Sequence, residues 1–114
     1  MCIMCSDKNI MTQSDMKSLK ICKNIVYLKE KYSFLFFLKC DDNSKLKYIP
    51  SNFIYLQSIE CPNNYFLSYI PNNFINLKIL NISNSLIHFL PSELINITNL
   101  NCSDCKYIKY TYCY

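Results

Sequence analysis

The sequence contains no glycine, alanine, arginine or tryptophan. A loop that binds phosphate through its backbone needs glycine, because only glycine takes positive φ at little cost. The lack of glycine therefore excludes P-loop, dinucleotide-binding and G-x-S-x-G nucleophile sites. The lack of arginine removes the planar group that recognises phosphate or guanine through two hydrogen bonds. These absences exclude the usual nucleotide-dependent enzymes and the usual proteins that read the DNA major groove.

The residues that are present predict a folded domain encoded by a gene with biased base composition. The chain has 114 residues, of which 51% are hydrophobic and 18% are charged. This balance predicts one folded domain around a core. Isoleucine, asparagine, leucine, lysine and tyrosine dominate. Their codons are mostly AT-rich and those of the missing residues are mostly GC-rich, which indicates an AT-rich genome.

The net charge of +4 comes entirely from residues 1–57. No lysine cluster is dense, so we expect a solvated surface and neither a nucleic acid nor a membrane as partner. The amino terminus has no basic segment followed by an apolar stretch. The longest apolar run, residues 34–38, is too short to cross a bilayer. We therefore expect an intracellular, cytoplasmic protein.

An internal repeat organises the chain. Pro50, Pro71 and Pro91 recur at a nearly constant interval, and each is followed at the third position by Phe or Leu. Extending the frame in both directions gives five copies of a pattern close to L-x-x-L-x-L-x-x-N. The copies begin at Met16, Leu35, Leu56, Leu77 and Ile97.

The L-x-L part of each copy has the period of a strand with alternate residues buried. Strands joined by a return segment are parallel, so the copies predict one parallel sheet. The strands are expected near residues 18–22, 37–41, 58–62, 79–83 and 99–103. The return segments carry apolar residues every three or four positions, which predicts short helical or 3₁₀ turns that begin at the prolines. Residues 24–34 contain no proline and are expected to form a more regular helix.

The position that closes each copy is polar or small. Where the chain leaves the strand and turns inward, a short side chain can satisfy buried backbone groups. We expect an interior ladder of such side chains, in which the last two are weaker substitutes for asparagine. Its members are Asn24, Asn43, Asn64, Ser85 and Cys105.

The repeat resembles the leucine-rich repeat family over residues 16–108. Its short units of about 20 residues are similar to those of large DNA viruses with AT-rich genomes, of entomopoxvirus or mimivirus type, and to those of bacterial effectors. The resemblance implies an α/β fold, a right-handed solenoid with the parallel sheet on its concave face and short turns on its convex face. Residues 1–15 are then an irregular amino-terminal cap, and residues 109–114 are a carboxy-terminal tail or cap.

The resemblance also implies a protein-interaction module without catalytic activity, plausible for a viral or pathogen protein that acts on a host partner. Two alternatives stay open: the recognition part of a truncated ubiquitin-ligase-like effector, and a decayed copy without activity. A homodimer through one end of the solenoid is a further expectation. Partner contacts are expected at the exposed strand positions, namely Ser18, Lys20, Phe37, Lys39, Asp41, Ser58, Glu60, Ile79, Asn81, Ser83, Asn99, Asn101 and Ser103.

Eight cysteines and one histidine carry no predicted chemistry. Cys2-x-x-Cys5 and Cys102-x-x-Cys105 resemble two halves of a zinc site, but four strand spacings would separate them by about 20 Å. The one histidine, His88, cannot build a multi-histidine site or a catalytic set. We therefore expect no catalytic residue, no metal and no cofactor.

Cys40 and Cys61 occupy the same inward position on neighbouring predicted strands. They could form a disulfide, but buried free cysteines act as small hydrophobic residues and fit the same place. In a reducing compartment the free thiols are favoured. We therefore predict two buried thiols.

Overall fold

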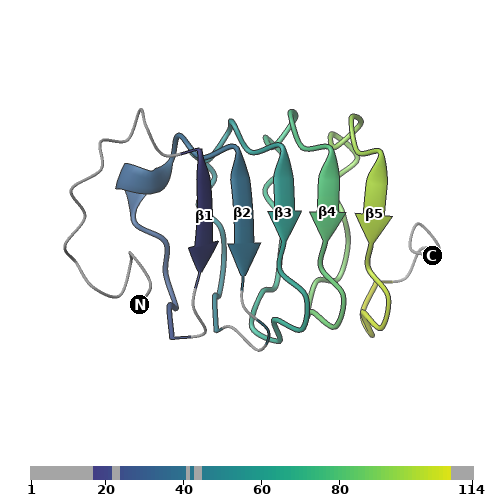
Figure 1. Ribbon diagram of the computed structural model, residues 1–114. Helices are drawn as coiled ribbons and strands as arrows, with labels where there is room; N and C mark the ends of the chain where they lie inside the picture. Colours follow the sequence, from purple (N-terminus) through teal and green to yellow (C-terminus); the bar gives the residue numbers. More distant parts are fainter. Residues whose placement is uncertain (1–16, 22–23, 41, 43–44, 109–114) are drawn as a thin grey trace.

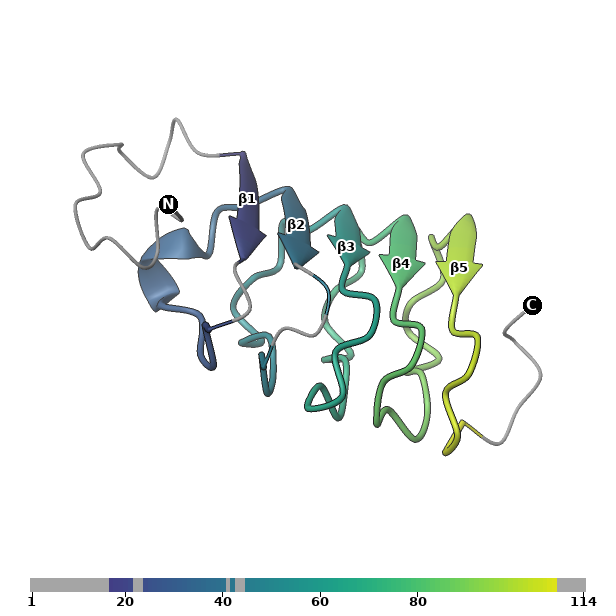
Figure 2. The ribbon, with the colours of Figure 1, turned by 60° about the horizontal axis from the view of Figure 1, so that its bottom comes forward.

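The structure, a computed structural model, describes residues 17–21, 24–40, 42 and 45–108. They form a parallel β-solenoid in which each turn adds one strand at a nearly constant interval along the chain (Figure 1). The strands lie in one layer, and the return segments lie on the other side of the stack (Figure 2). The five strands are β1 (Ser18–Ile21), β2 (Phe37–Cys40), β3 (Ser58–Glu60), β4 (Ile79–Asn81) and β5 (Asn99–Asn101).

The strands form a single parallel sheet in the order β1-β2-β3-β4-β5, which confirms the predicted five-stranded sheet. The register aligns equivalent repeat positions, so Leu38 pairs with Leu19 on one side and with Ile59 on the other. Every strand begins at the expected residue and ends one or two residues early. After β3 and β4 the strand ladder stops close to Asn63 and Asn84, whose φ angles of 56° and 57° are incompatible with a strand.

The return segments match the prediction only in part: single turns do begin at Pro50 and Pro91, but the described residues contain no α-helix. One 3₁₀ turn, η2 (Glu30–Tyr32), is the whole helical content of the described part of residues 24–34, so the α/β class and the regular helix expected there were wrong. Elsewhere the chain makes single turns in series. In one of them the Phe53 amide donates to the Pro50 carbonyl oxygen at 3.1 Å, and the Leu56 amide then donates to the Phe53 oxygen at 3.4 Å. Each of these turns closes one hydrogen bond between residues three apart and does not continue into a helix.

One hydrophobic core runs along the stack. Each turn contributes side chains at the same repeat positions, so like residues lie one above another. Phe53 and Phe74, for example, are both fully buried at the third position after the proline. The core is therefore a direct expression of the repeat: Leu, Ile, Phe and Cys fill it without any alanine or glycine.

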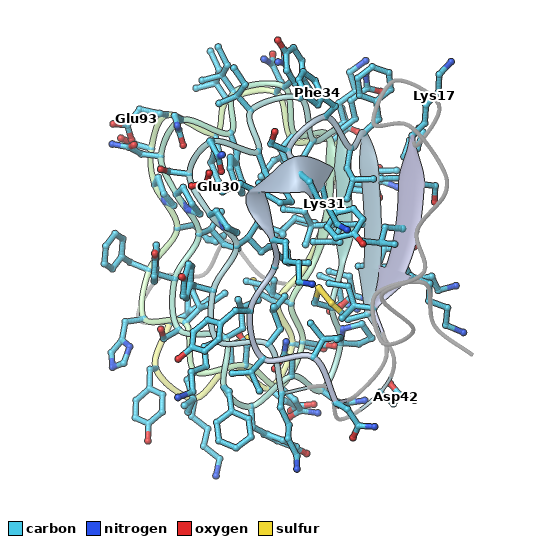
Figure 3. The ribbon with its side chains drawn as sticks, turned by 90° about the vertical axis from the view of Figure 1, so that its left-hand side faces the viewer. Lys17, Glu30, Lys31, Phe34, Asp42 and Glu93 are labelled. Atoms are coloured by element: carbon cyan, nitrogen blue, oxygen red, sulfur yellow. A yellow bond between two sulfur atoms is a disulfide. The ribbon has the colours of Figure 1, made fainter. Side chains whose placement is uncertain are left out.

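Cys40 and Cys61 are joined by a disulfide with their Cα atoms 4.7 Å apart. The prediction of two free thiols was therefore wrong. The parallel register places the two residues side by side on the inner face of β2 and β3, well within the Cα separation that a disulfide requires. Figure 3, viewed from the β1 end, shows the sulfur–sulfur bond inside the stack.

Several expectations fall on residues that the structure does not describe. The expected cap, residues 1–15, and the tail, residues 109–114, lie outside the described ranges, as do Asn43 and Asp41. In the part of the chain that is described, no helix has the length and apolar character needed to cross a membrane.

Candidate interaction face

The alternation of each strand creates two outward rows of side chains, which we call the strand face. In β1 and β2 the first and third residues are exposed, and the second and fourth are buried. The register continues this arrangement across all five strands. The first row is Ser18, Phe37, Ser58, Ile79 and Asn99; the second row is Lys20, Lys39, Glu60, Asn81 and Asn101.

Two residues of the first row have large, exposed apolar side chains. Phe37 is 43% exposed and Ile79 is 38% exposed. Ser58, expected to be a contact residue, lies between them and is only 8% exposed. Its direct neighbours across the sheet are Phe37 and Ile79, whose larger side chains flank it. The first row therefore presents two apolar points separated by a small, covered residue.

The second row is polar and graded in charge. Lys39 lies between Lys20 of β1 and Glu60 of β3, its direct neighbours in the sheet register. Asn81 and Asn101 continue the row without charge. A shallow depression of about 320 Å³ lies on this row, with Lys20, Lys39, Glu60 and Asn81 in its lining. The face thus runs from a cationic end at β1 to a neutral amide end at β5.

Serine side chains fix the orientation of both amides in the second row. The Asn81 Oδ1 atom accepts from the Ser83 amide at 3.2 Å and from its hydroxyl at 3.1 Å. The Asn101 Oδ1 atom accepts from the Ser103 amide at 3.1 Å and from its hydroxyl at 2.9 Å. These contacts leave the two amide nitrogens as donors for another molecule. Ser83 and Ser103, expected as contact residues, are half-buried and hold these amides in place.

Among its described members, the expected interior ladder is buried or half-buried at Asn64, Ser85 and Cys105. Asn64 and Ser85 are buried, and the Asn64 Oδ1 atom accepts from the Phe66 amide at 3.4 Å. The Cys105 thiol donates to the Ile82 carbonyl oxygen at 3.0 Å and lies 3.4 Å from the Ser85 hydroxyl.

Asn24 does not take the expected interior place and is exposed. Asn24 belongs to the first described turn, so among the described residues a neighbouring turn covers it on one side only. The ladder position is interior where turns stack on both sides.

A second ladder, missed in the sequence, lies one residue before the first. The Asn84 amide nitrogen donates to the Asn63 Oδ1 atom at 2.7 Å, and the Asn63 amide nitrogen donates to the Asp42 Oδ1 atom at 3.2 Å. Asn63, Asn84 and Asp104 all have positive φ, between 56° and 57°. Asparagine and aspartate tolerate this conformation better than other residues with side chains. In a chain without glycine, their recurrence at positions 42, 63, 84 and 104 was a usable signal.

Asparagines on the return side also connect successive turns. The Asn73 amide nitrogen donates to the Ser51 carbonyl oxygen at 2.6 Å. Asn76 and Asn96, which occupy the same repeat position in successive turns, also donate to the preceding turn. Their amide nitrogens donate to the carbonyl oxygens of Ile54 and Ile75, at 3.1 and 2.7 Å. The high asparagine content therefore has a structural role beyond codon bias.

The described residues hold no group of three or more side chains suited to bind a metal ion. His88 stacks on the Tyr107 ring at a centroid distance of 4.8 Å.

Comparison with known proteins gives no relative: no family model, no curated protein and no solved structure matches this chain significantly. The repeat pattern and the observed solenoid are the grounds on which a family and a function are proposed below.

Proposed function

We propose that this chain is a leucine-rich-repeat solenoid that binds a protein partner through its strand face and catalyses no reaction. Three observations support the repeat type. The first is a repeat length of about 20 residues, at the short end of the range for leucine-rich repeats. The second is that the L-x-L frame forms the strands. The third is that the buried or half-buried ladder residues Asn64, Ser85 and Cys105 bond to the chain around them. In such a solenoid the turns wind right-handed and the strand face is the concave side.

The observation that carries the binding proposal is the ordering of the strand face. Parallel strands hold neighbouring side chains at a spacing of about 4.8 Å, so little entropy is lost when a partner fixes them. Phe37 and Ile79 lie two strands apart, and a partner can cover each as an anchor. The second row then sets the register through charge and hydrogen bonds.

The charges of the second row define the partner's chemistry. Lys20 and Lys39 attract acidic side chains near β1, and Glu60 attracts a basic group at the middle of the sheet. Asn81 and Asn101 offer amide donors near β5. We therefore propose a partner with an acidic patch at one end of its contact surface and neutral acceptors at the other. A host protein targeted by a viral or pathogen protein fits the family resemblance.

A charge-reversal experiment tests this proposal. The double variant Lys20→Glu, Lys39→Glu changes the cationic end of the strand face. The double variant Lys45→Glu, Lys78→Glu makes the same change of net charge at exposed lysines outside it. Each protein is immobilised, incubated with cell lysate, and its captured proteins are quantified by mass spectrometry, with circular dichroism as the check on folding.

We expect a specific set of proteins that the wild type and the control variant capture equally. The strand-face variant should capture the same set at a level lower by about tenfold or more, since unfavourable charge contacts cost about 1–3 kcal/mol. Equal capture by all three proteins, or equal loss in both variants, would contradict the assignment of binding to the strand face.

A further inference from the structure

The last turn of the solenoid is less covered than the turn before it. Leu90, Ile97 and Leu100 are only half-buried, and Leu94 is 8% exposed. The equivalent residues one turn earlier, Ile70, Phe74, Leu77 and Leu80, are at most 3% exposed. A depression of about 990 Å³ is lined by Leu90, Leu94, Ile97 and Leu100 at this end, and it extends to the strand-face residues Glu60, Ile79 and Asn81. We call Leu90, Leu94, Ile97, Leu100 and the rest of β5 the end face.

The open edge of β5 presents the backbone groups of one residue, Leu100, that β4 does not use. The Asn99 amide donates to the Lys78 carbonyl oxygen at 3.1 Å, and the Asn101 oxygen accepts from the Ile82 amide at 2.8 Å. Since successive residues of a strand point their backbone groups to opposite sides, the N–H and C=O of Leu100 face away from β4. Such an edge is a template for another strand.

The opposite end of the stack presents no comparable apolar surface among the described residues. Leu19, Ile21 and Tyr32 are 0–3% exposed, and η2 lies beside β1 at that end (Figure 1). Head-to-tail stacking of β5 onto β1 would therefore bury little apolar surface. A second copy has a matching surface only at its own end face, and an interface between like surfaces closes as a two-fold dimer.

The sequence of β5 suits this two-fold pairing. In an antiparallel arrangement centred on Leu100, the Leu100 residues of the two copies exchange both backbone hydrogen bonds and point their side chains into the joint interior. Asn99 of each copy then lies opposite Asn101 of the other. No charge lies in the strand itself.

The flanking charges are complementary under the same symmetry. The two-fold axis places the segment before β5 opposite the segment after β5 of the second copy. Glu93 lies before the strand and Lys106 after it, and both are exposed. The Glu93 carboxylate accepts long hydrogen bonds from Asn72 and Ser92, at 3.4 and 3.5 Å. An ion pair with Lys106 of the second copy would replace these contacts and favour this pairing over unrelated ones.

We propose that a second copy of this chain covers the end face through antiparallel β5–β5 pairing, which extends the sheet across both copies. The two shorter extents of the molecule are only 25 and 18 Å, so the end of the stack is small and the interface falls below the standard size of a stable one. The dimer is therefore in reversible equilibrium with the monomer. The pairing is independent of the strand-face function and leaves both strand faces accessible.

Sedimentation equilibrium of the full chain tests the dimer over a range from about 1 to about 500 μM, which brackets the affinity of so small an interface. The wild type should show a monomer–dimer equilibrium. Leu100→Lys should shift it towards monomer by about tenfold or more, because it places a charge where two apolar side chains meet. Ile95→Lys, a change of the same kind at an exposed position of the same turn, should leave it unchanged.

A charge swap gives a second readout that does not disturb the core. Glu93→Lys alone should weaken the dimer, and the double variant Glu93→Lys, Lys106→Glu should restore it. A wild type that stays monomeric throughout, a dimer unaffected by Leu100→Lys, or a series of larger oligomers would overturn the proposal.

Discussion

The strand face and the return side of this solenoid both expose large apolar side chains, but they arrange them differently. On the return side, aromatic rings of successive turns contact each other. Tyr48 lies 5.6 Å from Tyr27 and 6.4 Å from Tyr69, and Phe34 stacks on Tyr55 at 6.0 Å between ring centroids. On the strand face, the cross-strand neighbours of Phe37 and Ile79 are serines and an asparagine. The Phe37 ring meets the edge of the Phe36 ring at 6.5 Å, but Phe36 is its neighbour in sequence, so this contact joins no two turns.

This difference separates side chains that hold the stack together from side chains available to a partner. A ring that stacks on its equivalent in the next turn stabilises the repeat. An apolar side chain between small polar neighbours gains little from the fold and can gain more from a second molecule. This contrast agrees with our proposal that the strand face binds a partner, while the rings of the return side hold successive turns together.

The largest effect should come from placing a charge at an inward position of β4, in contrast to the same charge at the adjacent outward position. Leu80 is 1% exposed and its neighbour Ile79 is 38% exposed. Leu80→Asp places an unpaired charge inside the stack, at a cost of more than about 4 kcal/mol, and should unfold the domain. Ile79→Asp should fold and melt close to the wild type. Circular dichroism melting of the two variants checks this, and similar curves for both would contradict the register.

The disulfide links β2 to the residue after β3, and among the described residues no disulfide links two return segments. Cys40 and Cys61 close a loop with a sequence separation of 21 residues, and such a cross-link contributes about 3 kcal/mol through the unfolded chain. The double variant Cys40→Ala, Cys61→Ala should lower the free energy of unfolding by about this amount. Cys105→Ala, at the one free cysteine among the described residues, should cost clearly less. Urea denaturation measures both changes.

Peptide mapping without reduction adds a direct check of the pairing: a linked peptide should contain both cysteines. If both cysteines are alkylated in the purified native protein, the cross-link does not form.

The smallest effect should come from the aromatic column. Tyr48→Ala removes both ring contacts of Tyr48 and should cost about 1–3 kcal/mol, since each aromatic pair contributes about 0.5–1.5 kcal/mol. Ile79→Ala on the strand face should cost about 0.5 kcal/mol or less, because the side chain is partly exposed and has small polar neighbours. Urea denaturation compares the two. Equal losses of unfolding free energy would contradict the distinction between rings that stabilise the stack and apolar side chains that are free to contact a partner.

The sheet could be predicted because its cause is local. Leu19, Leu38, Ile59 and Leu80 each begin an inward pair, and the period of two leaves one way to stack the strands. The returns were predicted less well, since an apolar residue at every third position suits a 3₁₀ turn as well as a series of single turns. Only the hydrogen bonds distinguish these two forms.

Parts of the face depend on residues distant in sequence and were out of reach. Ser58 is covered because Phe37 and Ile79, one turn away on either side, are large. The disulfide depends on a Cα distance that only the register fixes. The asparagines with positive φ, by contrast, carried a signal in a chain that lacks glycine, and Asn63 and Asn84 could have been identified from it.

The most direct test of the account compares one phenylalanine from each side. Phe37 on the strand face is 43% exposed, and Phe89 on the return side is 62% exposed. Quantitative capture from cell lysate is measured for Phe37→Ser, Phe89→Ser and the wild type at equal protein concentration. The account predicts that Phe37→Ser loses the specific partner by about tenfold, the effect of removing one buried anchor, while Phe89→Ser retains it. Loss with Phe89→Ser and retention with Phe37→Ser would place binding on the return side and contradict the account.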